Sequence, residues 1–164
     1  MKDNKTVAVV PGSFDPITVG HLNIISRAAE LCDKVFVAVM INSEKKYSFD
    51  IHEREAIARA ATCDIENVAV ISSEAMLYEL AKELSAEVIV KGVRNETDRA
   101  YEEKMAEFNS SHYPAANTLL LDADPTLSEM SSTLVRTLIS DGKSLEGAIP
   151  SGAIKEIEKI LAQK

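Results

Sequence analysis

Short apolar runs alternate along this chain with longer segments of helical period. Five of the runs are rich in β-branched residues and almost continuous in apolar side chains, a pattern typical of strands covered on both faces. The runs occupy residues 6–10, 35–41, 68–72, 88–91 and 118–121. They predict the strands of a buried parallel sheet.

Apolar residues spaced by three, four or seven positions predict amphipathic helices between and after these strands. The predicted helices cover residues 19–32, 51–62, 74–84, 98–109 and 133–141, and a last helix opens at Pro150 and Ser151. In the last helix, the side chains expected to be buried are Ile154, Ile157, Ile160 and Leu161.

Candidate caps mark several helix ends. Asp50, with Glu53 three residues later, has the spacing of a capping box. Ser73 and Ser131 are candidate N-caps, and Gly142 stands where a C′ glycine would end a helix.

The alternation of strands and helices predicts an α/β fold. Right-handed crossovers would give a single-domain, doubly wound parallel five-stranded sheet built from residues 1–164, the whole chain. In such a sheet, ligands bind beyond the carboxyl ends of the strands, where the strand order reverses. The loops after the first, second, fourth and fifth predicted strands are therefore expected to carry the function.

Composition and charge narrow the class of protein. The chain is 46% hydrophobic and 27% charged, which excludes collagen-like, disordered and disulfide-scaffold chains. Its formal net charge of −8 predicts repulsion of nucleic acid and anionic membranes. The longest apolar run, residues 35–41, is too short to span a membrane. Cys32 and Cys63 have no metal or redox spacing and are expected to be buried free thiols in a cytoplasmic protein.

The loop after the first predicted strand carries the first candidate chemistry. It delivers Gly20 and His21 to a helix N-terminus, where free amides and the helix dipole favour phosphate. Gly20 lets a ligand approach the backbone, and His21 can donate a hydrogen bond to the same anion. Alone, a histidine that opens a helix is more often a solvated residue, or one whose hydrogen bonds are satisfied within the protein.

Two motifs change that interpretation. Gly-Ser-Phe-Asp-Pro at residues 12–16, followed by Thr-Val-Gly-His at 18–21, resembles the signature of nucleotidyltransferases with a T/H-x-G-H motif. The serine-rich helix start at residues 130–136 resembles their second signature. The resemblance implies a Rossmann-like nucleotidyltransferase fold.

Within that superfamily, Lys-Gly-Val-Arg at residues 91–94, Tyr101-Glu102 and the chain length resemble the phosphopantetheine adenylyltransferase family. The resemblance implies an ATP-dependent enzyme of coenzyme A biosynthesis that transfers AMP from ATP to 4′-phosphopantetheine, giving dephospho-coenzyme A and pyrophosphate. It also implies Mg²⁺ bound with ATP, and a homohexamer.

The resemblance assigns roles to individual residues. It places His21 and Lys45 in catalysis. It places the phosphopantetheine substrate on Ser13, Lys45, Leu77, Lys91, Met105 and Asn109. It places the nucleotide on Ser13, Phe14, His21, Gly92, Val93, Arg94, Glu102, Leu127, Ser128, Glu129, Met130, Ser131, Ser132 and Thr133. No residue is assigned as a metal ligand.

Several of these residues have a second interpretation. Leu77 and Met105 lie on the apolar stripes of their helices and could be ordinary core residues. Glu102 could be a surface residue paired with Arg99. At the level of function, the alternatives are a glycerol-phosphate cytidylyltransferase, a nicotinate mononucleotide adenylyltransferase, or a non-catalytic nucleotide-sensing module on the same fold.

Overall fold

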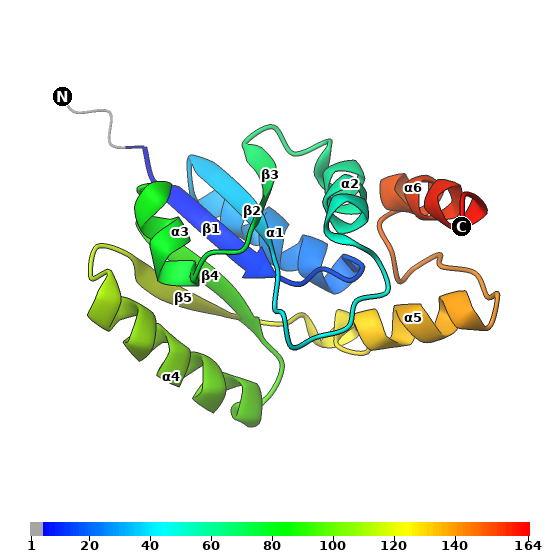
Figure 1. Ribbon diagram of the computed structural model, residues 1–164. Helices are drawn as coiled ribbons and strands as arrows, with labels where there is room; N and C mark the ends of the chain where they lie inside the picture. Colours follow the sequence, from blue (N-terminus) through cyan, green and yellow to red (C-terminus); the bar gives the residue numbers. More distant parts are fainter. Residues whose placement is uncertain (1–4) are drawn as a thin grey trace.

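The computed structural model describes residues 5–164, which form one parallel sheet with helices on both faces (Figure 1). The strand order is β3-β2-β1-β4-β5, so the predicted doubly wound α/β fold is confirmed. The strands are β1 (Val7–Gly12), β2 (Lys34–Met40), β3 (Val68–Ser73), β4 (Val88–Val93) and β5 (Asn117–Asp122). Residues 1–4 of the predicted domain lie outside the described residues.

The helices follow the predicted order. They are α1 (Val19–Leu31), α2 (Ile51–Thr62), α3 (Leu77–Glu83), α4 (Glu96–His112), α5 (Ser132–Ser140) and α6 (Ser151–Ala162), with a short 3₁₀ helix, η1 (Pro125–Leu127), before α5. Within residues 5–164, none of these helices is long and apolar enough to cross a membrane.

Local capping explains where the predicted boundaries were right and where they were wrong. The Asp50–Glu53 capping box starts α2, and the Ser131 hydroxyl caps α5, both as predicted. Ser73 does not cap α3, because its hydroxyl accepts the amide of Ala75 in a turn and the helix starts after Met76. Asn95 caps α4, so that helix begins earlier than predicted.

The helices bury two apolar clusters on opposite faces of the sheet. On one face, α1, α2, α5 and α6 pack against alternate residues of β1 and β2. On the other face, a smaller cluster joins α3 to β1, β2 and β4. Figure 1 shows α6 beside α2, with α5 below them.

Two side chains predicted to be buried are exposed. Cys63 caps the carboxyl end of α2, where the helix leaves the sheet, and only Cys32 is buried. In α6, Ile157 and Ile160 are buried as predicted, but Leu161 is exposed. Ala153 completes the buried stripe of α6.

The sheet opens along one line, between β1 and β4. β1 pairs with β2 over six residue pairs, but with β4 only through Ala8–Val88 and Val9–Ile89. Both strands continue to their carboxyl ends without pairing to each other, and both run two residues further than predicted. The strand order reverses at this point, so the separation produces the crevice that ligands use in doubly wound sheets.

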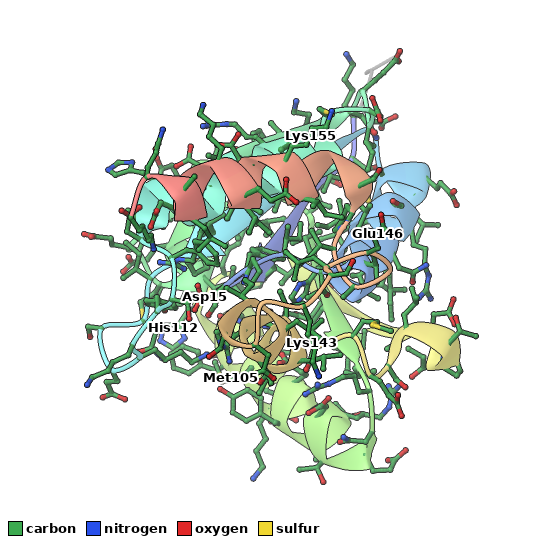
Figure 2. The ribbon with its side chains drawn as sticks, turned by 90° about the vertical axis from the view of Figure 1, so that its right-hand side faces the viewer. Asp15, Met105, His112, Lys143, Glu146 and Lys155 are labelled. Carbon is green, nitrogen blue, oxygen red and sulfur yellow. The ribbon has the colours of Figure 1, made fainter. Side chains whose placement is uncertain are left out.

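The contact between α2 and α6 generates a prediction about stability. A Cβ added to Gly152 would lie 2.9 Å from the Ala60 carbonyl oxygen, a backbone atom that cannot turn aside. Gly152→Ala should therefore lower the free energy of unfolding by about 1–3 kcal/mol, as overpacking usually does. Chemical denaturation measures this change. Lys155→Ala, on the exposed face of the same helix (Figure 2), is the control, and equal stability of both variants would contradict the prediction.

Candidate active site

The separation of β1 and β4 opens into a cleft of about 420 Å³. This volume lies within the range of small-molecule sites, roughly 300–1,000 Å³. The residues predicted to bind nucleotide that line it are Phe14, His21, Gly92, Arg94, Glu102, Leu127, Ser128, Met130, Ser131, Ser132 and Thr133. The structure therefore brings most of the predicted nucleotide residues together.

The first loop, residues 13–18, forms one wall of the cleft. Phe14 has a φ of 48°, in the left-handed region, and its ring lies over Gly12. A Cβ at Gly12 would come within 2.9 Å of that ring, so only glycine allows this packing. The Phe14 ring meets the His21 imidazole edge to face, with centroids 5.1 Å apart. The contact between Phe14 and His21, two residues of the first motif, thus helps to set the position of the His21 ring.

A capping box fixes the orientation of His21. Thr18 is the N-cap of α1, and its hydroxyl accepts a hydrogen bond from the His21 amide at 3.3 Å. In return, the Thr18 amide donates to Nδ1 of His21 at 3.0 Å. Histidine here takes the place that Glu or Gln usually has in a capping box. Because Nδ1 accepts a hydrogen bond from the Thr18 amide, the imidazole proton is on Nε2, the nitrogen available to a ligand.

His21 is neutral in the free protein at neutral pH. Burial in the cleft wall, with a smaller contribution from the Arg94 guanidinium, lowers the pKa of His21 from 6.5 to about 4. The hydrogen bond from the Thr18 amide to Nδ1 also lowers the pKa of His21, because a protonated imidazolium has no lone pair on Nδ1 with which to accept it. His21 therefore faces the cleft as a neutral hydrogen-bond donor.

Two helix N-termini present unpaired amides to the cleft. In α1 the amide of Val19 bonds the Ala148 carbonyl and that of His21 bonds Thr18, but the amide of Gly20 has no acceptor within residues 5–164. At the start of α5, the amides of Ser132 and Thr133 likewise have no acceptor in the described chain. Such amides at the positive end of a helix dipole form an anion-binding site.

A second, narrower cavity of about 60 Å³ adjoins the cleft. It lies between α3, α4 and β4 and is lined by Leu77, Lys91, Met105 and Asn109, four of the residues predicted to bind phosphopantetheine. Leu77 also packs against the smaller apolar cluster, so the core and binding interpretations are compatible there. Lys91 and Glu102 line both cavities.

Lys91 and Glu102 form an ion pair where the two cavities meet, with Nζ 3.5 Å from Oε2. The alternative that Glu102 pairs with Arg99 is therefore wrong. Arg99 instead pairs with Asp122, because α4 lies along β4 and β5 and points Arg99 at the end of β5. At a more exposed part of the nucleotide cleft, Arg94 is paired with Asp98 at 3.2 Å.

The Lys45 loop, residues 41–50, carries the other predicted catalytic residue. Lys45 is exposed, and its Nζ lies 3.5 Å from the Ser13 hydroxyl of the first loop. Among the described residues, no carboxylate forms an ion pair with Lys45, unlike Lys91 and Arg94. The ammonium of Lys45 is therefore free to meet an incoming anion.

Three predicted nucleotide residues do not line the cleft. Ser13 lies outside both cavities, with its hydroxyl 3.5 Å from Nζ of Lys45. The side chain of Val93 is buried in the core, and Glu129 is exposed outside both cavities. At these two positions only the backbone is close to the cleft residues on either side. The predicted roles of Val93 and Glu129 in nucleotide binding find no support in this geometry.

Sequence reasoning passed over other residues that shape the site. Asp98 and Asp124 line the cleft, and both follow the carboxyl end of a strand, the one signal that could have indicated them. Hydrogen bonds from Thr126 lower the pKa of Asp124 and keep it ionised. Asp15 is buried and accepts two backbone amides, a role that its sequence position before a proline did not reveal.

The described chain offers little to a metal ion by itself. Residues 5–164 contain no group of three His, Cys, Asp or Glu side chains placed to hold a metal. The cleft carboxylates Asp98 and Glu102 are already paired with cations. A magnesium ion in the cleft would therefore depend on phosphate oxygens and water for most of its coordination.

The low pKa of His21 predicts how stability changes with pH. Near pH 6.5 the imidazole of the unfolded chain takes up a proton, whereas that of the folded chain does so only near pH 4. The free energy of unfolding should thus fall as pH drops from 6.5 toward 4, because the unfolded state binds the extra proton. Denaturation curves across this window should show a weaker pH dependence for His21→Gln than for the wild type. His52→Gln, which removes an exposed imidazole, should keep the wild-type dependence. If the free energy of unfolding of His21→Gln depends on pH as strongly as that of His52→Gln, the prediction is wrong.

Comparison with known proteins places these features in a family. A family model described as cytidylyltransferase-like matches residues 9–138. The phosphopantetheine adenylyltransferase of Lactobacillus acidophilus is 41% identical over 157 residues, which cover 95% of this chain and 98% of the relative. The enzyme of the same name from Clostridium novyi is 40% identical over 151 residues, covering 92% of this chain and 94% of the relative.

The crystal structure of a protein assigned as a nicotinate-nucleotide adenylyltransferase, from Vibrio parahaemolyticus, superposes with a TM-score of 0.75. The match covers 94% of this chain and 93% of that one at 17% identity, and so shows a shared fold alone. The sequence relatives, which extend over nearly the whole chain, carry the closer assignment, and they confirm the family predicted from the motifs. The chain thus belongs to the phosphopantetheine adenylyltransferase family of nucleotidyltransferases.

Proposed function

We propose that this cleft transfers AMP from ATP to the phosphate of 4′-phosphopantetheine, giving dephospho-coenzyme A and pyrophosphate. The observation that carries the proposal is the pair of adjoining cavities that share Lys91 and Glu102. A two-substrate reaction needs two such spaces that meet at the reacting atoms. The family membership of the chain supports the same reaction.

The chemistry needs positioning and charge stabilisation rather than a covalent nucleophile. An oxygen of the acceptor phosphate, already ionised at neutral pH, attacks the α-phosphorus of ATP. The bond to the bridging α–β oxygen breaks, and pyrophosphate leaves with that oxygen. The site must bring the two anions together in line and stabilise the charge that develops on the transferring and leaving groups.

His21 and the helix N-termini fit the stabilising role. The Nε2–H of neutral His21 donates a hydrogen bond to the α-phosphate without an extra charge to desolvate. The unpaired amide of Gly20 lies one residue away. The amides of Ser132 and Thr133 face the same cleft and suit the β- and γ-phosphates. Their charge stabilisation is preorganised, which is the usual source of large rate effects.

Lys45, Ser13 and Lys91 fit the acceptor side. Lys45 has no carboxylate partner in the described chain and lies over the Ser13 hydroxyl, so both can bind the acceptor phosphate. Lys91 can leave Glu102 for that phosphate, which frees the Glu102 carboxylate to accept from the nucleotide. The narrow cavity beside Leu77, Met105 and Asn109 would take the pantetheine arm.

Three further features belong to the same proposal. Magnesium enters with the phosphates of ATP, since Asp98 and Glu102 of the cleft are paired with cations and Asp124 accepts hydrogen bonds from Thr126. The chain acts in the cytoplasm, and its net charge of −8 disfavours nucleic acid and anionic membranes as partners. It assembles as a homohexamer, for which the exposed side chains of Tyr101, Phe108 and Leu119 offer apolar surface.

The reaction and the role of His21 are tested together. Wild-type protein with ATP and 4′-phosphopantetheine should release pyrophosphate in a coupled assay. His21→Ala should lower turnover by roughly 10²-fold, the scale of losing one charge-stabilising donor. Its dissociation constant for ATP, measured by calorimetry, should change much less, because the helix amides remain.

The outcomes separate the alternatives. His52→Ala, at an exposed histidine, is the control and should keep wild-type turnover. If wild-type protein is inactive with 4′-phosphopantetheine but active with glycerol phosphate and CTP, or with nicotinate mononucleotide, the acceptor assignment is wrong. Near-wild-type turnover of His21→Ala would remove His21 from catalysis.

A further inference from the structure

Arg54 in α2 is a buried charge that the reaction does not use. Its side chain is only 1% exposed, and among the described residues no carboxylate forms an ion pair with it. A guanidinium without a counterion in a protein interior is costly unless its donors are satisfied. Its position therefore calls for an explanation beyond the packing of α2.

The donors of Arg54 are satisfied by the backbone of three separate segments. Nη1 donates to the carbonyl of Ser13 in the first loop at 2.8 Å and to that of Met40, the last residue of β2, at 3.1 Å. Nε donates to the carbonyl of Phe49, near the end of the Lys45 loop, at 3.1 Å. A single planar group thus joins the first loop to both ends of the Lys45 loop.

Tyr47 extends this connection into the Lys45 loop itself. Its ring lies over the Arg54 guanidinium, with Cζ 3.8 Å from the ring centroid. Its hydroxyl accepts the amide of Asn42 at 2.7 Å, and the Asn42 carbonyl in turn accepts the amide of Lys45 at 3.0 Å. The turn that carries Lys45 is therefore hydrogen-bonded to Tyr47 through Asn42, and the ring of Tyr47 stacks on Arg54.

Asp15 fixes the far end of the same loop. Its carboxylate accepts the amides of Ser48 and Phe49, each at 2.9 Å. Figure 2 labels Asp15 near α5, and Arg136 of that helix donates to the Asp15 carbonyl at 2.9 Å. With the end of the loop anchored in this way, the side chains of Arg54 and Tyr47 connect the Lys45 turn to the Ser13 backbone.

We propose that Arg54 is a positioning residue for the transfer reaction, acting through Lys45. By binding the Ser13 carbonyl and supporting the Lys45 turn on the same guanidinium, it sets the distance between the Lys45 ammonium and the Ser13 hydroxyl. That distance decides whether both groups reach one acceptor phosphate. The inference rests on the proposed function, which places the acceptor phosphate between these two groups.

Lysine cannot replace arginine in this role. An ammonium is a compact point charge without the planar fork that spans three carbonyls, and it does not stack on a ring as guanidinium does. Arg54→Lys keeps the positive charge but should release the Lys45 turn. Its kcat/KM for 4′-phosphopantetheine should fall roughly tenfold or more, since misplacement by about 1 Å can cost up to about 10²-fold. The KM for ATP should rise less than the KM for the acceptor, because Arg54 touches the first loop of the nucleotide cleft only at the Ser13 carbonyl.

A double-mutant cycle tests whether the effect passes through Lys45. In the Lys45→Ala background there is no ammonium to position, so adding Arg54→Lys should change kcat/KM by less than about twofold. Arg59→Lys is the matched control, because Arg59 lies on the same helix with a side chain 59% exposed and should keep wild-type kinetics. If Arg54→Lys does not fold, Tyr47→Phe replaces it in the double-mutant cycle. This variant keeps the ring stacked on Arg54 and removes the hydrogen bond from the Asn42 amide.

Each result has a distinct meaning. The inference is supported if Arg54→Lys lowers kcat/KM in the wild-type background but not in the Lys45→Ala background. Equal losses in both backgrounds, or a rise in the KM for ATP as large as that for the acceptor, would overturn it and leave the proposed function intact. Full activity of Lys45→Ala would overturn the inference alone, because the reaction would then proceed without the ammonium that Arg54 positions. Inactive wild-type protein would instead overturn the proposed function, and this inference with it.

Discussion

The reciprocal pair of hydrogen bonds between Thr18 and His21 is the constraint on which the rest of the site depends. It begins α1, and by the same two bonds it turns the imidazole so that Nδ1 faces the backbone and Nε2 faces the cleft. A helix cap and a reactive-site donor are usually separate requirements. Here the His21 side chain meets both, because it takes part in the cap of α1 and presents Nε2 to the cleft. Thr18, the N-cap that orients His21, also fixes where the helix starts.

The sheet supplies the space that this donor faces. Because β1 and β4 pair only near their amino ends, their carboxyl ends diverge, and the first loop and the end of β4 become opposite walls of the cleft. The helix dipoles of α1 and α5 then meet across it. The acidic chain thereby gathers its anion-binding groups at one edge, which reconciles a net charge of −8 with the two phosphorylated substrates of the proposed reaction.

Local patterns predicted the fold well because they act over a few residues. The Asp50–Glu53 box started α2 where it was expected, and β-branched runs located all five strands. The errors at the starts of α3 and α4 were local, at Ser73 and Asn95. The errors in the site arose where a longer-range contact decided the outcome. The choice of Lys91 as the partner of Glu102 depends on how α4 lies over the sheet, which no spacing within α4 reveals. The partners of Arg54 and Asp15 are backbone groups up to 41 residues away, and backbone groups leave no signature in a sequence.

The protonation of His21 in the folded protein is the most direct test of this account. Long-range ¹H–¹⁵N correlation spectra of protein labelled with ¹⁵N in its histidine rings distinguish a protonated ring nitrogen from one that only accepts a hydrogen bond. At pH 7 without ligand, we expect His21 to carry its proton on Nε2 and to show Nδ1 as an acceptor. A proton on Nδ1, or an imidazolium with both nitrogens protonated, would contradict the capping geometry and the role given to the neutral donor.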